Sequence, residues 1–175
     1  MTSTYSQKAV DLLQPELGND YLGLSEFRGE KIVRVAPNSI VRACKFLRDL
    51  DVLKFDLLNL LTAVDYWPGE PRFAVDYRLV SMKTYEWIGL RVLLDSTSAE
   101  VETVETIFSS ANWHEREIYD MYGIQFIGHS DLRRILMPED WVGHPLRKDY
   151  PLGYEEVQFT FNFDDIDDKK SYAND

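Results

Sequence analysis

Three apolar runs joined by very short turns constrain the fold of this chain more than any other feature. The runs cover residues 55–64, 73–82 and 87–94 and are rich in Val, Leu, Ile, Phe and Tyr, which favour β-strands. The first turn, residues 67–71, contains two prolines and a glycine, and the second consists only of residues 83–86. Because strands connected this tightly pair as antiparallel neighbours, the middle of the chain is expected to form a sheet.

The segments before these strands have regular patterns of their own. Residues 31–36 alternate apolar and charged side chains, as a half-buried strand requires. Residues 37–39 are typical of a helix start, and the helix that follows them carries an apolar stripe that includes Cys44. Residues 5–14 predict an earlier short helix. Three helix breakers follow it: Pro15, Gly18 and Asn19.

A second long helix is expected to begin near Thr97. Its hydroxyl and the carboxylate of Glu100 have the spacing of a capping box. The predicted buried face of this helix consists of Val101, Val104, Phe108 and Ala111. The order of elements therefore predicts an α+β domain over residues 1–142, in which helices cover one face of a mostly antiparallel sheet to give two layers.

The pattern changes after this domain. Residues 143–175 hold several Gly and Pro residues, one short alternating run at 157–163 and an acidic end. A segment this irregular buries little of its own surface, and its aromatic residues favour contact with another protein over a solvated tail. We therefore expect an extended C-terminal segment, residues 143–175, that packs on partner subunits.

Composition excludes several classes of function. The 175 residues carry 30 acidic against 19 basic side chains, a formal net charge of −11, which disfavours nucleic acid and anionic lipid as partners. Cys44 is the only cysteine, so it forms no disulfide within the chain and no thiolate set for an iron–sulfur cluster or a structural zinc, and we expect a small buried apolar side chain. No window reaches the roughly 20 apolar residues of a membrane span, so direct membrane insertion is not expected.

The densest set of polar side chains lies in residues 113–123. On a helix, Arg116, Glu117 and Asp120 would place two acids and a base on one face, and Gly123 is a natural helix stop. Two basic pairs follow, at residues 133–134 and 147–148. The simplest physical interpretation is an ion-pair network that ties the acidic helix to the loops after it or to a neighbouring subunit.

Catalytic interpretations of this region have little support. His114 and Glu115 begin the HExxH pattern of zinc proteases, but Ile118 stands where the second histidine belongs. The sequence contains neither G-x-G-x-x-G nor G-x-x-x-x-G-K-[ST], so no motif supports binding of NAD, flavin or ATP. Two alternatives stay open. One is acid–base catalysis by the paired carboxylates of Glu117 and Asp120. The other is a metal site on Glu115, Glu117, Asp120, His129 and His144.

The same region resembles the signature of a complex I family, the 30 kDa or C-type subunit of respiratory-chain NADH dehydrogenase. The resemblance is carried by Glu115–Glu117, Asp120, Met121, His129, Arg133, Ile135 and Leu136, and continues without gaps through residues 136–141 and 143–150. The residues expected to make up the signature and an interface or ion-pair network are Glu115, Arg116, Glu117, Asp120, Met121, Gly123, His129, Arg133, Arg134, Pro138, Trp141, Gly143, Pro145, Arg147, Lys148, Asp149 and Tyr150.

The resemblance implies a non-catalytic structural and assembly subunit in the peripheral arm of proton-translocating NADH:quinone oxidoreductase. It implies a place beside the large D-type subunit that lines the quinone cavity and beside the neighbouring iron–sulfur subunits, on the cytoplasmic side of the bacterial cell membrane. It also implies no cofactor on this chain, with FMN and iron–sulfur clusters held by partner subunits. The signature is shared by photosynthetic, ferredoxin-fed complex I and by membrane-bound hydrogenases, which are alternatives, as is a free-standing carboxylate or metal enzyme.

Overall fold

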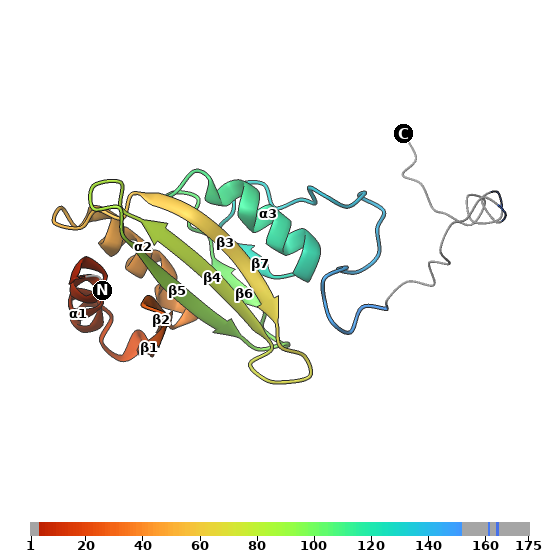
Figure 1. Cartoon of the computed structure of the whole chain (residues 1–175). Helices are drawn as coiled ribbons and strands as arrows, with labels where there is room; N and C mark the ends of the chain where they lie inside the picture. The colour runs from red at the N-terminus through yellow and green to blue at the C-terminus, as the bar shows by residue number, and fades with distance from the viewer. Residues whose placement is uncertain (1–3, 152–160, 162–163, 165–175) are drawn as a thin grey trace.

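A five-stranded sheet forms the centre of the protein in the computed structural model, which describes residues 4–151, 161 and 164 (Figure 1). The strands lie in the order β1-β2-β5-β4-β3, and every neighbouring pair is antiparallel except β2 and β5. The strand bounds are β1 Tyr21–Phe27, β2 Glu30–Val35, β3 Leu57–Asp65, β4 Phe73–Val80 and β5 Trp87–Leu94. The predicted α+β class and the three predicted central strands are confirmed.

Strand β1 was not predicted, although a hairpin signal precedes β2. Phe27 pairs with Glu30, so the connection between the two strands consists of only Arg28 and Gly29. Both residues have positive φ, 52° and 82°. A two-residue turn with positive φ at both positions matches the right-handed twist of paired strands, and this turn therefore sets the register of β1.

Helix α1, Thr4–Leu17, is longer than the predicted 5–14. The expectation that Pro15 ends it is wrong: Pro15 lies inside the helix, in its last turn, so few helical residues follow the disturbance that a proline causes. Leu13 and Leu17 lie one turn apart and are both buried in the core, which favours keeping this turn helical. Gly18, with φ of 56°, follows the last helical residue.

Helix α2, Ile40–Asp49, follows the short 3-10 turn η2, Pro37–Ser39, as predicted. Ser39 does not cap it: its Oγ donates to the Asp20 carboxylate at 2.6 Å. The thiol of Cys44 is buried as predicted, and burial raises its pKa. Side chains of α1, α2 and alternate sheet residues form one continuous core, so these helices cover one face of the sheet.

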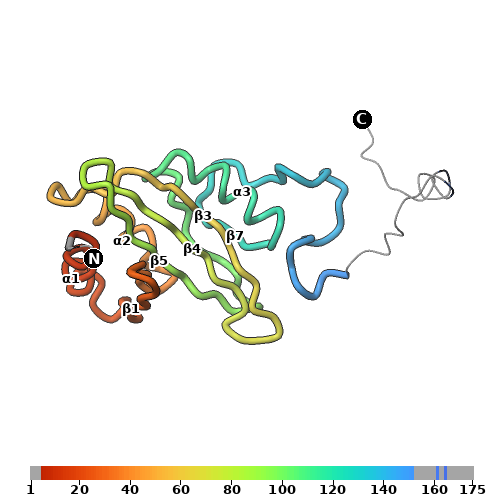
Figure 2. The backbone as a smooth tube through the Cα atoms, viewed as in Figure 1, coloured from red at the N-terminus to blue at the C-terminus, as the bar shows by residue number. Residues whose placement is uncertain are grey.

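The long helix predicted from Thr97 is wrong. Residues near it form strand β6, Glu100–Glu102, and the helix α3 begins later, at Ala111, and ends at Tyr122. Strand β6 pairs in parallel with β7, Gln125–Ile127, which lies beyond α3 in the chain and beside β6 in space (Figure 2). The i, i+3 spacing of Val101 and Val104 suited a helix, but the structure buries Val101 in strand β6 and Val104 beyond the end of that strand.

The fold places α3 against the edge strand β3, with the loop after β7 returning along the helix (Figure 1). None of the helices in the described residues is long and apolar enough to cross a membrane. The alternating run predicted at 157–163 lies almost wholly outside the described residues.

Candidate functional site

The C-terminal end of α3 is bound by the loop that follows β7, which we call the clamp loop (residues 133–150). The last carbonyl groups of a helix have no partner inside the helix. Here Nδ1 of His144 donates to the carbonyl of Asp120 at 2.9 Å, the N–H of Leu146 to that of Met121 at 3.1 Å, and Nε of Arg147 to that of Tyr122 at 2.5 Å. The clamp loop therefore caps the helix end group by group.

Gly123 makes this close approach possible. It has φ of 73° and ends α3 as predicted, with its N–H donating to the carbonyl of Tyr119 at 2.8 Å. A Cβ at this position would collide with the His144 ring and lie 2.6 Å from a guanidinium nitrogen of Arg147. Glycine is thus required both for the left-handed conformation and for the space that the clamp loop occupies.

The carboxylate of Asp120 is the centre of the clamp. Its side chain is fully buried, and Oδ2 accepts from the N–H groups of Ile135, Leu136 and Met137 at 3.1, 2.8 and 2.8 Å. The Arg134 guanidinium pairs with Oδ1 at 2.6 Å. Burial alone would raise the pKa of Asp120, but these donors hold the pKa below its usual value. With both oxygens saturated, Asp120 is poorly placed to accept a proton from a substrate.

Arg134 joins Asp120 to the outer part of the clamp loop. Its second terminal nitrogen donates to the carbonyls of Trp141 and Gly143, both at 3.0 Å. Gly143 has φ of 85°, and a Cβ there would lie 2.8 Å from the Tyr150 ring, whose hydroxyl donates to the carbonyl of Val142 at 3.2 Å. Pro138 and Pro145 lie half-buried in the same loop. One guanidinium thus organises residues that are distant along the loop.

The other charged residues that were predicted to share one face of α3 with Asp120 do not lie together in the structure. Arg116 is buried and donates to the carbonyls of Arg133 and Arg134, both at 3.1 Å. Glu117 points to solvent, so it does not share a buried face with Asp120. Arg133 is 68% exposed and pairs with Asp131 at 2.9 Å. The bases near this helix therefore bind mainly backbone carbonyls of the clamp loop.

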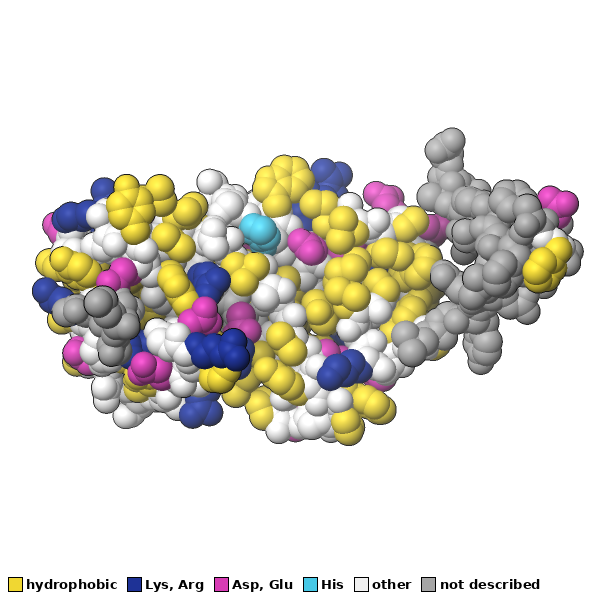
Figure 3. Space-filling view, in the orientation of Figure 1, with side chains coloured by type: hydrophobic (Ala, Val, Ile, Leu, Met, Phe, Trp, Pro, Cys, Tyr) yellow, Lys and Arg dark blue, Asp and Glu magenta, His cyan; other side chains and the backbone are white. Residues whose placement is uncertain are grey.

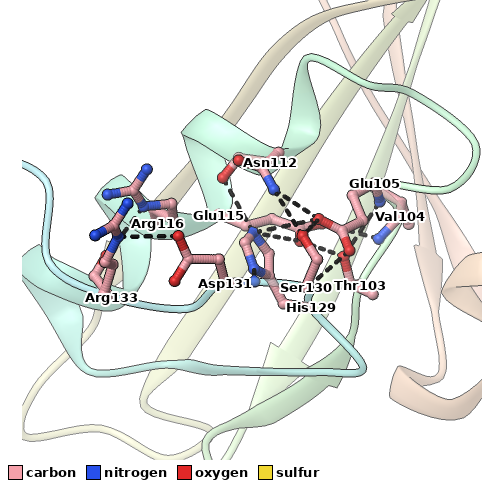
Figure 4. A network of polar contacts seen from close by, with 10 residues as sticks. All are labelled: Thr103, Val104, Glu105, Asn112, Glu115, Arg116, His129, Ser130, Asp131 and Arg133. Atoms are coloured by element: carbon pink, nitrogen blue, oxygen red, sulfur yellow. Dashed lines mark hydrogen bonds and ion pairs between the residues drawn. The ribbon is translucent and has the colours of Figure 1, made fainter.

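Glu115, one turn earlier on α3, is the centre of a second buried network (Figure 4). Its carboxylate accepts from the Thr103 hydroxyl and from the N–H of Val104, the latter at 2.8 Å. Burial raises the pKa of Glu115 to about 7, although these two donors oppose the rise. The network connects α3 to the segment that follows β6.

His129 lies beside Glu115 with its side chain fully buried. Its Nδ1 accepts from the N–H of Asp131 at 3.0 Å, so Nε2 carries the proton and donates to the carbonyl of Asn112 at 3.1 Å. Nε2 also lies 3.6 Å and 3.9 Å from carboxylate oxygens of Glu105 and Glu115. His129 therefore holds the chain after β7 against the start of α3 (Figure 4).

A third network ties the end of the clamp loop to the sheet. Arg72 binds the Asp65 carboxylate through two nitrogens at 3.1 and 2.9 Å, and Asp149 through two at 3.0 and 2.5 Å. The N–H of Lys148 donates to Asp65 at 2.9 Å, and the guanidinium of Arg147 lies over the Phe73 ring. Burial would raise the pKa of Asp65, but Arg72 and the backbone donors lower it to about 2.

Sequence reasoning missed several residues of these networks. They are Asp65, Arg72, Thr103, Glu105, Asn112 and Ser130. Arg72 lies in the β3–β4 turn and meets Asp149 only because the fold brings positions 77 residues apart together. No local pattern marks such a pair. Within the described residues, no three His, Cys, Asp or Glu side chains are arranged to hold a metal ion.

The fold and the clamped helix define a class of α+β proteins, and two solved structures share the fold. One is a trypsin-resistant fragment of Nqo5, with a TM-score of 0.62 and 25% identity, covering 74% of this chain and all of that one. The other is a chain in the structure of the membrane-bound sulfane sulfur reductase, an archaeal respiratory membrane complex, with a TM-score of 0.67 and 24% identity over 83% of this chain and 85% of that one. The second likeness concerns the fold alone.

The sequence is similar to a family model, respiratory-chain NADH dehydrogenase, 30 kDa subunit, over residues 33–156. It is 49% identical to the C-type subunit of NADH-quinone oxidoreductase from Roseiflexus sp. (strain RS-1), covering 94% of each chain. It is 45% identical to the same subunit from Geobacter sulfurreducens, over 84% of this chain and 90% of the relative. The chain therefore belongs to the family of the 30 kDa subunit of respiratory-chain NADH dehydrogenase, and it is a subunit of complex I.

Proposed function

We propose that this chain is a non-catalytic assembly subunit of the peripheral arm of proton-translocating NADH:quinone oxidoreductase. In this proposal it braces the arm beside the large D-type subunit and the neighbouring iron–sulfur subunits while electrons pass from NADH to quinone. It lies on the cytoplasmic side of the bacterial membrane and is held there by its partners. FMN and the iron–sulfur clusters belong to partner subunits.

The observation that carries the proposal is that the charged side chains in and around the clamp loop bind groups of this same chain. Asp120, Arg116 and Arg134 are directed at the chain's own backbone and at each other. Meanwhile the loop leaves three apolar side chains exposed: Leu136 by 61%, Val142 by 85% and Leu146 by 52%. Figure 3 shows hydrophobic side chains gathered over this part of the surface. Exposed apolar clusters of this kind mark interaction sites.

The clamp also lowers the cost of binding a partner. An exposed loop normally loses conformational freedom when it docks, which weakens association. Here the backbone of Leu136 and Leu146 is already bound to α3 through the Asp120 carboxylate and the Met121 carbonyl. The apolar side chains are therefore presented on a preorganised surface, as an assembly subunit requires. The 143–175 segment continues from this surface and is proposed to pack on the same partners.

The test is a substitution of Val142 by Glu in the native complex. A charge in an apolar interface costs affinity, so we expect less assembled complex, with unchanged turnover for each complex that forms and an unchanged melting temperature of the isolated chain. Val52→Glu is the matched control, because Val52 is 48% exposed in the α2–β3 connection. Normal assembly of Val142→Glu with abolished turnover would contradict the structural role. Purification without iron–sulfur or flavin subunits would contradict the assignment to this machine.

A further inference from the structure

The sheet has a second face that the helices do not cover. Helices α2 and α3 both lie on the inner face, because Cys44 of α2 and Ile118 of α3 belong to the same buried cluster as Tyr77 of β4. Two hollows on the outer face are lined, in the described chain, only by strand residues and by the β3–β4 turn, with no helical residue.

The outer face is more apolar than an ordinary solvated sheet face. Antiparallel sheets exposed on one side usually carry polar residues there. Here Ile32, Leu60 and Leu93 occupy outer positions on three different strands, and Leu60 is 42% exposed. Ile32 pairs with Gly89, Gly89 with Arg78 and Arg78 with Leu60, so Ile32 and Leu60 lie in one row across the sheet, and Leu93 lies further along β5 on the same face.

Most charges on this face are already neutralised. Arg91 binds both carboxylate oxygens of Asp76, at 2.6 and 2.7 Å. Arg78 pairs with Glu30 at 3.0 Å and lies over the Trp87 ring at 3.7 Å. Paired charges of this kind are cheaper to remove from water than lone ones.

A preformed groove runs along this face. Its floor is formed by β1, β2 and β5 around Ile32 and Leu93, its wall is the β3–β4 loop, and its volume is about 570 Å³. A smaller hollow of about 220 Å³ shares Ile32 and continues towards Leu60 and Trp87. Glu70 holds the wall in place, because its carboxylate accepts from the N–H groups of Arg72 at 2.9 Å and Ser96 at 3.1 Å.

Arg34 is the exception to the pairing. It lines the groove, is exposed, and makes no ion pair or hydrogen bond through its side chain with any described residue. Its guanidinium lies over Gly23 of β1, where a Cβ would come within 3.0 Å of the terminal nitrogen. A groove that combines Ile32 and Leu93 with a guanidinium that pairs with no described residue is complementary to a segment that carries apolar side chains and one carboxylate.

We propose that this outer-face groove is a second docking surface, separate from the clamp loop, for an acidic and apolar segment of another subunit of the same complex. The apolar side chains of that segment cover Ile32, Leu60 and Leu93, and its carboxylate pairs with Arg34. This inference rests on the proposed function, since it places the chain between two neighbours. A chain that contacts partners on two sides acts as a spacer as well as a brace.

The experiment places a photo-crosslinking benzoylphenylalanine at Leu60 in the native complex. We expect a crosslink to one other subunit, and none from the same group at Met82, a control that is 54% exposed in the β4–β5 turn. A crosslink to residues 152–175 of this chain, to a second copy of it or to no protein would overturn the proposal. Purification of this chain without other complex subunits would instead be a failure of the proposed function.

Two further measurements keep the proposal testable if crosslinking is inefficient. Leu60→Cys should react with a maleimide on the order of tenfold more slowly in the complex than in the isolated chain; equal rates would overturn the proposal. Cys44 is fully buried and does not interfere. Arg34→Glu should weaken assembly on the order of tenfold. Arg28→Glu, the same charge change in the β1–β2 turn, should not; equal effects would overturn the carboxylate pairing.

Discussion

Asp120 and Glu115 are two fully buried carboxylates on one helix, and they have opposite properties. Asp120 accepts three backbone N–H groups and a guanidinium, and its pKa is lowered. Glu115 accepts one hydroxyl and one N–H, and burial raises its pKa to about 7. Burial alone therefore does not set the charge of these groups. The number and charge of the donors that reach each carboxylate decide it.

Asp120 is the carboxylate of the two that accepts the larger number of hydrogen bonds. Replacing Asp120 by Asn should therefore have the largest effect on the free energy of unfolding. The amide nitrogen would oppose the donors from residues 135–137 and leave the Arg134 charge without its partner. We expect a loss of about 3–5 kcal/mol in the free energy of unfolding, measured by chemical denaturation. Glu117→Gln, exposed on the same helix, should change it by less than about 0.5 kcal/mol. A loss similar to that of Glu117→Gln would mean that the clamp is not held by Asp120.

Glu115 should make stability depend on pH in a window that Asp120 does not affect. The folded pKa of about 7 exceeds the ordinary 4.5, so the folded state binds the proton more tightly. Its contribution is complete below pH 4.5 and is lost as the pH rises through 7, by roughly 3 kcal/mol in total. Glu115→Gln should remove that slope from unfolding curves, whereas Glu105→Gln should retain it. A slope unchanged by Glu115→Gln would show that other groups produce it.

Asp120 should act at the opposite end of the pH range. Its folded pKa is lowered, so its stabilisation is present above the ordinary value of 3.8 and is lost as the pH falls through the folded pKa. As the pH falls below about 4, wild-type protein should therefore lose more stability than Asp120→Asn. Acid unfolding measures this difference. Equal acid sensitivity of the two proteins would contradict a charged Asp120 in the fold.

Gly123→Ala separates backbone strain from contact with the clamp loop. The positive φ and the approach of His144 and Arg147 should together cost about 1–3 kcal/mol of unfolding free energy. Gly29→Ala is the matched control, because Gly29 has φ of 82° but no atom within 4 Å of an added Cβ. The difference between the two variants measures the contact. No difference would show that the loop moves aside freely.

Asp149→Asn should have the smallest effect. Asp149 pairs with Arg72 but is 42% exposed, so solvent screens the pair and the loss should be below about 1 kcal/mol. Asp65→Asn, which removes a carboxylate that is 1% exposed, should cost several times more. Hydrogen exchange at the Lys148 N–H distinguishes them: Asp65→Asn should expose this group, and Asp149→Asn should not. Faster exchange at Lys148 in Asp149→Asn than in Asp65→Asn would mean that the end of the clamp loop is held by Asp149.

Much of the fold was predictable because its signals are local. The β3–β4–β5 meander follows from apolar runs and short turns, and the end of α3 follows from Gly123. The helix predicted from Thr97 failed because the helix-like spacing of Val101 and Val104 says nothing about the distant strand that pairs with this segment. Strand β6 exists only because β7, beyond α3, offers it a partner. Whether residues 100–102 form a strand therefore depends on tertiary structure.

The candidate site was also predictable only in part. The sequence alone was sufficient to find the charged helix, the basic pairs and the family resemblance, since residue types at fixed spacing can be recognised in a sequence. It could not assign partners: Arg134 rather than Arg116 meets Asp120, and Arg72 joins Asp149 from 77 residues away. Nor could it show that Arg34 lines a groove and pairs with no other residue in the part of the chain that the structure describes. Pairing and burial depend on which distant segments the core brings together, so only the tertiary structure decided them.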